Sequence, residues 1–393
     1  MQNAKFKIED MKPYYLAFIF IALTLCATKD MDAQTMIPKR SYMHLTGQIG
    51  RKYVLTMNLV KINDSIYADW QTRPLSANDQ QNASLTLKDG NMQVICGKMK
   101  NDGSCTLAAP FSKAMPILTG QLSKDQKLTG TWEDEDGKFP FELRETYSGG
   151  SLPFNVSYLK GSVPLVKKPG SPKGSIDIAI LTPVESTNAV LSDSLKKIIL
   201  EKFMKRPVRS LNPDLNLNTL KEAYYDKYIS ANEALYNNKS GGPSLEWESL
   251  EFMHILYNDK HFLTFYIISY AFTGGAHGLE TEDFYVADLK KGEILRLNDI
   301  FIDGYEREMT AMITQKFSDM NSLKAGQKLT GAGFFTDEVK PTDNFYLTGD
   351  GIGFFYNHYE IAPYASSPNT CFLTFDKLKT LIRQEGILQP LLK

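Results

Sequence analysis

Polar and apolar residues alternate through much of the region 41–148, most clearly over residues 53–60. An alternation with a period of two residues predicts β-strands that bury one face. Asn-Asp and Asp-Gly pairs recur at short intervals in the same region and indicate tight turns between the strands. We therefore predict an all-β amino-terminal domain over residues 41–148, folded as a small sandwich or an open barrel.

A Leu-Thr-Gly phrase occurs three times in this region, ending at Gly47, Gly120 and Gly130. A glycine inside a strand marks a bend or a close approach of another backbone. The three phrases are typical of a curved antiparallel meander, although a chance recurrence in a β-rich segment explains them equally simply.

The pattern changes after this region. Residues 149–175 are rich in Pro, Gly and Lys, which predicts a linker that holds at most an isolated strand. Beyond it, segments with apolar residues at helical spacing are separated by runs that are typical of strands. The predicted helices cover residues 193–204, 217–235 and 305–320. We predict that residues 176–393 form an α+β domain, in which helices are interspersed with a mainly antiparallel sheet.

The charge of the chain is balanced, with 44 basic and 45 acidic residues among 393. Because neither sign is concentrated in a long run, the sequence lacks the basic surface that nucleic-acid binding requires. It also lacks a polybasic segment that would hold the protein at a membrane surface.

Residues 1–33 have the pattern of a secretory leader, since Lys12 precedes a short apolar run that ends near Leu25. Two cleavage sites fit this pattern. Cleavage before Cys26 would produce a lipoprotein anchored through that cysteine, whereas cleavage after Ala33 would release a soluble protein. Both alternatives predict an exported protein, either periplasmic or a lipoprotein of the outer membrane or cell surface, which contacts a membrane only through the lipid.

Cys96 and Cys105 flank a turn at residues 101–103 that is typical of a β-hairpin. If the two cysteines lie opposite each other on paired strands, they can form a disulfide in an oxidising compartment. The alternative is a pair of half-buried thiols.

Two short turns carry the residues that are most typical of recognition. The first follows an apolar strand that ends at Tyr270, and contains Gly274, Gly275 and His277. The second contains Tyr359, Glu360 and Tyr364. Glycine permits sharp backbone reversals, and tyrosine is frequent at binding surfaces. We predict that folding places the two turns side by side and that these seven residues bind a protein or a cell-wall glycan.

The sequence shows no nucleophile elbow, no phosphate-binding loop and no zinc-ligand spacing. We therefore predict no catalytic residue, no metal and no cofactor. Two other hypotheses remain. His277 and Glu360 could act as the acid and base of a glycan hydrolase if their side chains are in hydrogen-bond reach. Alternatively, both turns serve only to stabilise the fold.

Four motifs in the carboxy-terminal half occur in a fixed order: FTGGAHG at 272–278, DLKKGE at 288–293 leading to LNDIF at 297–301, NFYL at 344–347, and YEIAPY at 359–364. This set resembles the extracytoplasmic domain of the RsiV family of lysozyme-sensing anti-sigma factors. It is also similar to the non-catalytic amino-terminal region of PdaC peptidoglycan deacetylases. The resemblance covers about residues 176–393.

The resemblance implies an α+β domain that has no catalytic activity of its own. In the sensor family such a domain engages lysozyme, and in the deacetylases it accompanies a separate catalytic domain. Neither a sigma-binding segment nor a complete deacetylase domain is recognisable in this sequence. Anti-sigma signalling and deacetylation are therefore not implied, and the expectation that remains is binding of a lysozyme-like protein or of cell-wall glycan.

Overall fold

The computed structural model describes residues 37–75, 94–109, 116–185, 189–237, 244–366 and 369–392. The predicted leader and Cys26 lie outside these residues. The described residues up to Thr146 form one compact unit, and those from Tyr147 onward form a second. No described helix is both long enough and apolar enough to span a bilayer.

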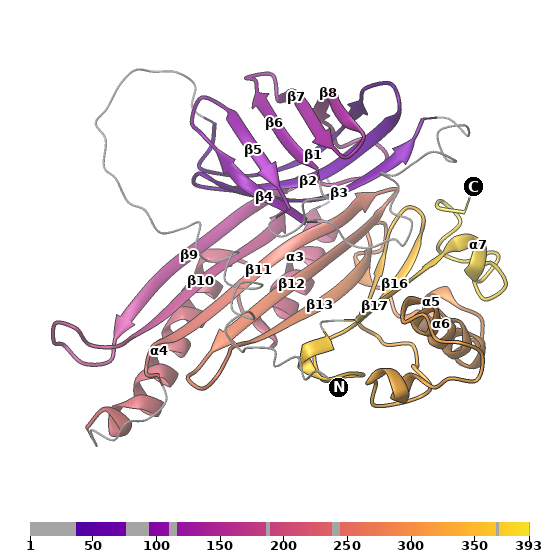
Figure 1. Cartoon of the computed structure of the whole chain (residues 1–393). Coiled ribbons are helices and arrows are strands. Elements are labelled where there is room, and N and C mark those ends of the chain that lie inside the picture. Colours follow the sequence, from indigo (N-terminus) through magenta and orange to yellow (C-terminus); the bar gives the residue numbers. More distant parts are fainter. Residues whose placement is uncertain are drawn as a thin grey trace. The chain divides into compact units, whose positions relative to one another are not determined.

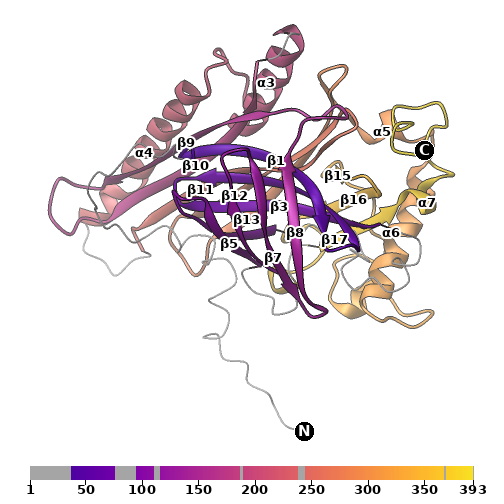
Figure 2. The same ribbon diagram turned by 90° about the horizontal axis from the view of Figure 1, so that it is seen from above.

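The amino-terminal unit is a closed antiparallel barrel, in which the last strand pairs back onto the first (Figures 1 and 2). Its strands are β1 (Arg40–Ile49), β2 (Tyr53–Ile62), β3 (Ser65–Pro74), β4 (Val94–Met99), β5 (Ser104–Ala108), β6 (Ile117–Leu122), β7 (Lys127–Asp134) and β8 (Gly137–Glu145). The all-β prediction is confirmed, but the expected sandwich or open barrel is replaced by a closed one. The interior is filled by apolar side chains, including Trp70 and Trp132, whose rings meet edge to face at 5.0 Å.

Two of the recurring Leu-Thr-Gly glycines, Gly47 and Gly130, lie where neighbouring barrel strands approach each other closely. A Cβ atom on Gly47 would lie 1.9 Å from the carbonyl oxygen of Glu142 on β8. A Cβ atom on Gly130 would lie 2.0 Å from the carbonyl oxygen of Thr119. No side chain fits in either place, so glycine is what permits the strong curvature of the closed barrel.

The predicted disulfide is wrong. Cys96 pairs with Ala108 across the β4–β5 hairpin, whereas Cys105 pairs with Met99. Since side chains alternate between the two faces of a strand, Cys105 points into the barrel and Cys96 points away from it. Both thiols are free, and burial raises the pKa of Cys105 to about 11, which leaves it protonated and unreactive.

The carboxy-terminal unit contains a six-stranded sheet with the order β14-β13-β12-β11-β10-β9. The strands are β9 (Phe154–Pro164), β10 (Lys173–Pro183), β11 (Trp247–Asp259), β12 (Phe262–Phe272), β13 (Leu279–Asp288) and β14 (Glu293–Ile294). All pairs are antiparallel except β10 and β11, which run parallel. The parallel pair arises because the chain between them crosses through two helices.

Those helices are α3 (Ala189–Met204) and α4 (Pro213–Asn237), and both pack on the same face of the sheet (Figures 1 and 2). Buried residues of α3 at helical spacing, among them Leu195, Ile199 and Phe203, form its sheet-facing side. From α4, the ring of Tyr228 covers Gly174, where a Cβ atom would lie 2.6 Å from the ring. The predicted helices over 193–204 and 217–235 are confirmed.

The predicted linker over 149–175, expected to hold at most an isolated strand, contains a strand of the main sheet. Residues 154–164 are strand β9, which pairs along all of its eleven residues with β10. The proline content of this segment favours a linker, but β9 is an edge strand and pairs on one side only, with β10. An edge strand therefore tolerates prolines at its ends.

A second sheet of three strands completes this unit, formed by β15 (Phe345–Leu347), β16 (Gly351–Tyr356) and β17 (Asn369–Thr374). It is accompanied by α5 (Leu297–Ile300), α6 (Glu306–Met320), α7 (Phe375–Leu378) and the 3-10 turns η2 (Leu329–Ala332) and η3 (Tyr364–Ser366). The predicted helix over 305–320 is confirmed by α6.

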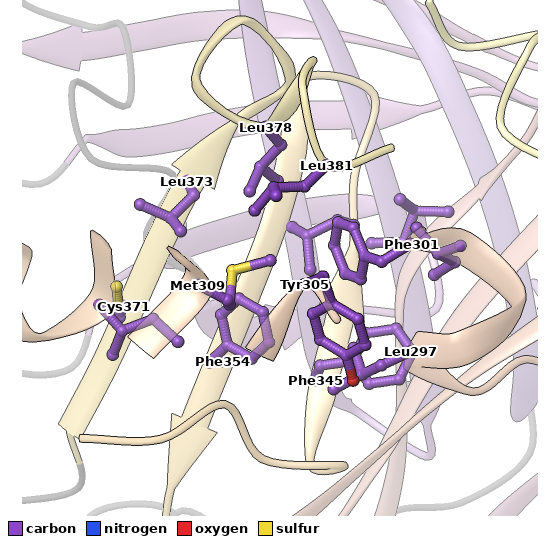
Figure 3. Packing of buried hydrophobic residues seen from close by; sticks show 14 of the residues in the cluster. Leu297, Phe301, Tyr305, Met309, Phe345, Phe354, Cys371, Leu373, Leu378 and Leu381 are labelled. Carbon is purple, nitrogen blue, oxygen red and sulfur yellow. The ribbon is translucent and has the colours of Figure 1, made fainter. Parts of the chain in front are cut away.

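The two faces of β16 are buried in different cores. Phe354 packs with Met309 and Tyr305 in the large cluster between the small sheet and α6 (Figure 3). The next residue, Phe355, points to the other face and packs with Tyr346, Tyr266 and Phe284 against the six-stranded sheet. The small sheet is therefore held on both sides, and it carries the loop after β16 toward the edge of β13.

Candidate functional site

The two glycine- and tyrosine-rich turns lie against each other, although some eighty residues separate them in the chain. The ring of Tyr364 stacks on His277 with 4.5 Å between ring centroids, and on His358 with 4.2 Å. Tyr359 is also in contact, at 5.7 Å from Tyr364. We call His277, His358, Tyr359 and Tyr364 the His–Tyr cluster.

Local structure places each half of this cluster. Residues 273–278 connect β12 to β13, and Gly274 and Gly275 adopt φ angles of 87° and 105°. Such angles are readily adopted by glycine and are costly for other residues. The second half follows β16 directly, because that strand ends at Tyr356.

Two asparagine side chains attach the second half to the sheet. Asn357 accepts a hydrogen bond from the backbone N–H of Glu282 at 2.8 Å, and donates one to the carbonyl of the same residue at 3.2 Å. Asn344 accepts from the N–H of Phe284 at 2.7 Å and donates to Glu282 at 2.9 Å. Strand β14 covers the edge of β13 only at Ala287 and Asp288. The two side-chain amides therefore take the place of a neighbouring strand.

Tyr270, predicted as a site residue, lies beneath the first turn. Its side chain covers Gly278, where a Cβ atom would lie 2.4 Å from the tyrosine ring. Burial raises the pKa of Tyr270, and the charges of Glu248, Tyr364 and Glu280 add to the effect. The ring of Tyr270 thus packs against the turn that carries His277.

The cluster has an exposed side and a buried side. Tyr359 is 53% exposed and has a φ angle of 68°, a left-handed conformation that is rare for a bulky residue. His277 and Glu360 are exposed as well, whereas His358 is buried. A large aromatic side chain that is held at the surface in a strained conformation is a common feature of binding sites.

Burial also changes protonation around the cluster. It lowers the pKa of His358, and the nearby His277 lowers it further, although a backbone hydrogen bond at Tyr364 opposes the shift. His358 is therefore neutral at physiological pH. Loss of surrounding water raises the pKa of Glu360, and burial raises that of Glu280 to about 7.

His277 and Glu360 do not form the acid–base pair that a hydrolase would need. His277 Nδ1 lies 2.8 Å from the carbonyl oxygen of Gly278, and the Glu360 carboxylate accepts hydrogen bonds from Asn357. Among the described residues, no hydrogen bond or ion pair connects His277 to Glu360. Sequence reasoning did not select Asn344 and Asn357 as site residues. The only available signal was their position beside the ends of short apolar strands.

Two family models match consecutive parts of the carboxy-terminal unit. Residues 173–280 match the model described as deacetylase PdaC, and residues 298–376 match the protein of unknown function DUF3298. The carboxy-terminal unit is related to the PdaC and DUF3298 families. The PdaC match covers β10 to the start of β13, and the DUF3298 match covers the small sheet with α6.

The His–Tyr cluster combines both matched segments. His277 belongs to the PdaC-related part, while His358, Tyr359 and Tyr364 belong to the DUF3298-related part. The stacking of His277 on Tyr364 therefore joins the two parts at the candidate site.

Solved structures of DUF3298 proteins are similar to this chain. A family member from Bacteroides fragilis is 27% identical, with a TM-score of 0.58 over 62% of this chain and 98% of its own. A family protein from Pseudomonas aeruginosa is 19% identical, with a TM-score of 0.44 over 60% of this chain and 97% of its own. No curated protein sequence matches the chain.

Replacing Asn357 tests whether its amide attaches the second turn. In Asn357→Leu the N–H of Glu282 loses its partner, so we expect the unfolding free energy to fall by about 1–3 kcal/mol in a urea titration. The matched control is Asn218→Leu, because Asn218 is exposed and bonds only within its own helix α4. The control should change stability by less than about 0.5 kcal/mol. Equal stabilities for both variants would show that the amide of Asn357 does not hold the turn.

Proposed function

We propose that this protein is an exported, non-catalytic component of the cell envelope, and that its carboxy-terminal unit binds cell-wall glycan through the His–Tyr cluster. The observation that carries this proposal is the stacking of Tyr364 on both His277 and His358, with Tyr359 exposed beside them. Stacked, partly exposed aromatic rings offer flat apolar faces to the rings of a sugar. Carboxylates at Glu280 and Glu360 supply acceptors for its hydroxyl groups.

The family relation supports the same class of ligand. PdaC is described as a deacetylase, and our chain matches that model over a part that includes Tyr270 and His277. A domain that accompanies an enzyme of the cell wall would hold the enzyme near its polymer. The predicted leader over residues 1–33 supports export to the compartment where the polymer is found.

A protein ligand is the second candidate, and one observation favours it. Phe335 is 56% exposed, and its backbone N–H bonds to the carbonyl of Ile361 at 2.8 Å, so it borders the loop that carries Tyr359. Two large exposed aromatic side chains beside one loop are typical of a protein interface. The resemblance to RsiV sensors makes lysozyme the partner to test.

We expect Tyr359→Ala to weaken binding of muramidase-released peptidoglycan fragments by about tenfold or more, because Tyr359 offers the largest exposed ring of the cluster. Isothermal titration of the full chain measures this effect. Thermal melting should stay unchanged, since an exposed ring contributes little to the core. The matched control is Tyr236→Ala on α4, which should bind as the parent does.

The same titration with lysozyme separates the two ligands. Binding of lysozyme but not of glycan, lost in Tyr359→Ala, would replace the first proposal by the second. Full affinity of Tyr359→Ala and His277→Ala for both ligands would remove the His–Tyr cluster from either function. Release of a sugar or peptide product by the purified protein would contradict a non-catalytic role.

A further inference from the structure

One straight row of side chains crosses the six-stranded sheet on the face opposite α3 and α4. Lys160 on β9 pairs with Asp177 on β10, which is in register with Leu250 on β11. Leu250 pairs with Tyr270 on β12, and Tyr270 pairs with Glu280 on β13. Neighbouring strands lie about 4.8 Å apart, so the five positions span about 19 Å. We call these five residues, together with Glu248, the carboxylate row.

The face on which the row lies follows from strand alternation. Gly174 lies under Tyr228 of α4, so its position belongs to the helix-covered face. Asp177 is three residues further along the same strand and therefore points to the other face. Glu248 is two residues before Leu250 on β11, which places its side chain on the same face as the row.

The row leads directly into the His–Tyr cluster. Tyr270 is a member of the row, and its ring covers Gly278, which follows His277 in the chain. Tyr364 stacks on His277 with 4.5 Å between ring centroids, so Tyr270 and Tyr364 contact neighbouring residues of the same turn. A ligand bound at the cluster can therefore continue over Tyr270 and along the sheet face.

Carboxylates outnumber cations in the row. Lys160 Nζ lies 2.8 Å from Asp177 Oδ2 and is the only basic group among the six residues. Asp177 is only 8% exposed, and its other oxygen, Oδ1, is buried and has no hydrogen-bond partner within the described structure. Buried polar atoms nearly always have a partner, so this oxygen is an acceptor whose donor is not among the described side chains.

The two glutamates of the row indicate the same chemistry. Burial raises the pKa of Glu280 to about 7. Burial also raises the pKa of Glu248; the positive charge of Lys160 opposes this shift, and the negative charge of Asp177 adds to it. Burial and a neighbouring negative charge both favour the neutral form of a carboxyl group. A cation bound among these carboxyl groups would instead stabilise their ionised forms.

We propose that the carboxylate row selects a cationic glycan, namely an oligomer of amino sugars whose acetyl groups have been removed. Its ammonium groups would donate hydrogen bonds to Asp177, Glu248 and Glu280, while Leu250 and Tyr270 contact the faces of the sugar rings. Charge complementarity decides for this ligand over a neutral glycan. The inference rests on the proposed glycan binding and specifies which glycan the surface takes.

Titration calorimetry of the full chain with a β-linked glucosamine tetramer and with its N-acetylated counterpart tests the inference. We expect the glucosamine tetramer to bind about tenfold more tightly. Glu248→Gln and Glu280→Gln should each reduce this preference about fivefold, because each removes one charge-assisted hydrogen bond. Glu248→Gln should bind the N-acetylated tetramer as the parent does, because Glu248 belongs to the row and not to the His–Tyr cluster. Glu233→Gln, an exposed change on α4, is the matched control and should keep the full preference.

The outcomes separate this inference from the function on which it rests. If the N-acetylated tetramer binds as tightly as the glucosamine tetramer and loses affinity only in Tyr359→Ala, glycan binding stands and the carboxylate row is not the selector. If neither tetramer binds, both proposals are wrong. If tetralysine binds as tightly as the glucosamine tetramer, the row does not recognise sugars, and the inference is overturned.

Discussion

Gly47→Ala should destabilise the amino-terminal barrel by at least about 3 kcal/mol, which is the upper part of the range for overpacked sites. The added Cβ atom would lie 1.9 Å from the carbonyl oxygen of Glu142. That oxygen belongs to the backbone of β8, which pairs with β1 and closes the barrel. The clash can be relieved only by separating these two strands. Urea unfolding followed by tryptophan fluorescence measures the effect, because Trp70 and Trp132 are buried in the barrel.

Gln48→Ala provides the control, since Gln48 is the next residue on β1 and its side chain is exposed. This variant should unfold within about 0.5 kcal/mol of the parent. If Gly47→Ala unfolded at the same urea concentration as Gln48→Ala, the backbones of β1 and β8 would not approach each other as closely at Gly47 as the structure shows.

Phe354→Ala should reduce the unfolding free energy of the carboxy-terminal unit by about 3–5 kcal/mol. Phe354 is fully buried and packs among Met309, Tyr305 and their neighbours from α6 and the small sheet (Figure 3). Removing its ring leaves a cavity that rigid surroundings cannot fill. Urea unfolding followed by circular dichroism reports the loss, because the helices of the described structure belong to this unit.

Phe335→Ala removes the same ring from a position that is 56% exposed, and it should cost less than about 0.5 kcal/mol. Phe354→Ala should also weaken ligand binding, since β16 leads directly to Asn357 and His358. A Phe354→Ala protein as stable as Phe335→Ala would show that this cluster is not the core of the unit.

Much of the fold could be predicted from local patterns. The alternation over residues 53–60 lies within strand β2, the helical spacing over 193–204 lies within α3, and that over 305–320 matches α6 and its N-cap residue. These patterns record which face of each element is buried, and that information is local in the chain. Both turns of the candidate site are also recognisable from local sequence, because they are short polar segments that contain glycine or tyrosine.

Other features depend on which strands pair and on which residues lie opposite each other. The local pattern of apolar and polar residues does not carry this information. The hairpin that holds Cys96 and Cys105 was recognisable, but a shift of three residues between the paired positions decides that they cannot join. The proline-rich segment before β10 has the composition of a linker, although pairing with β10 makes residues 154–164 a strand. The carboxylate row also exists only through register, because its members come from five strands.

The amino-acid sequence alone determined the buried faces of β2, α3 and α6, the positions of the two turns of the candidate site, and the residues with recognition chemistry at 270–277 and 359–364. Tertiary structure alone decided that β8 closes onto β1, that Asn344 and Asn357 bond to the edge of β13, and that Tyr364 stacks on His277 and His358. The physical reason is that burial preference belongs to each residue in turn. Strand closure, edge hydrogen bonds and ring stacking are energies shared between segments far apart in the chain, and they exist only after the backbone has brought those segments together.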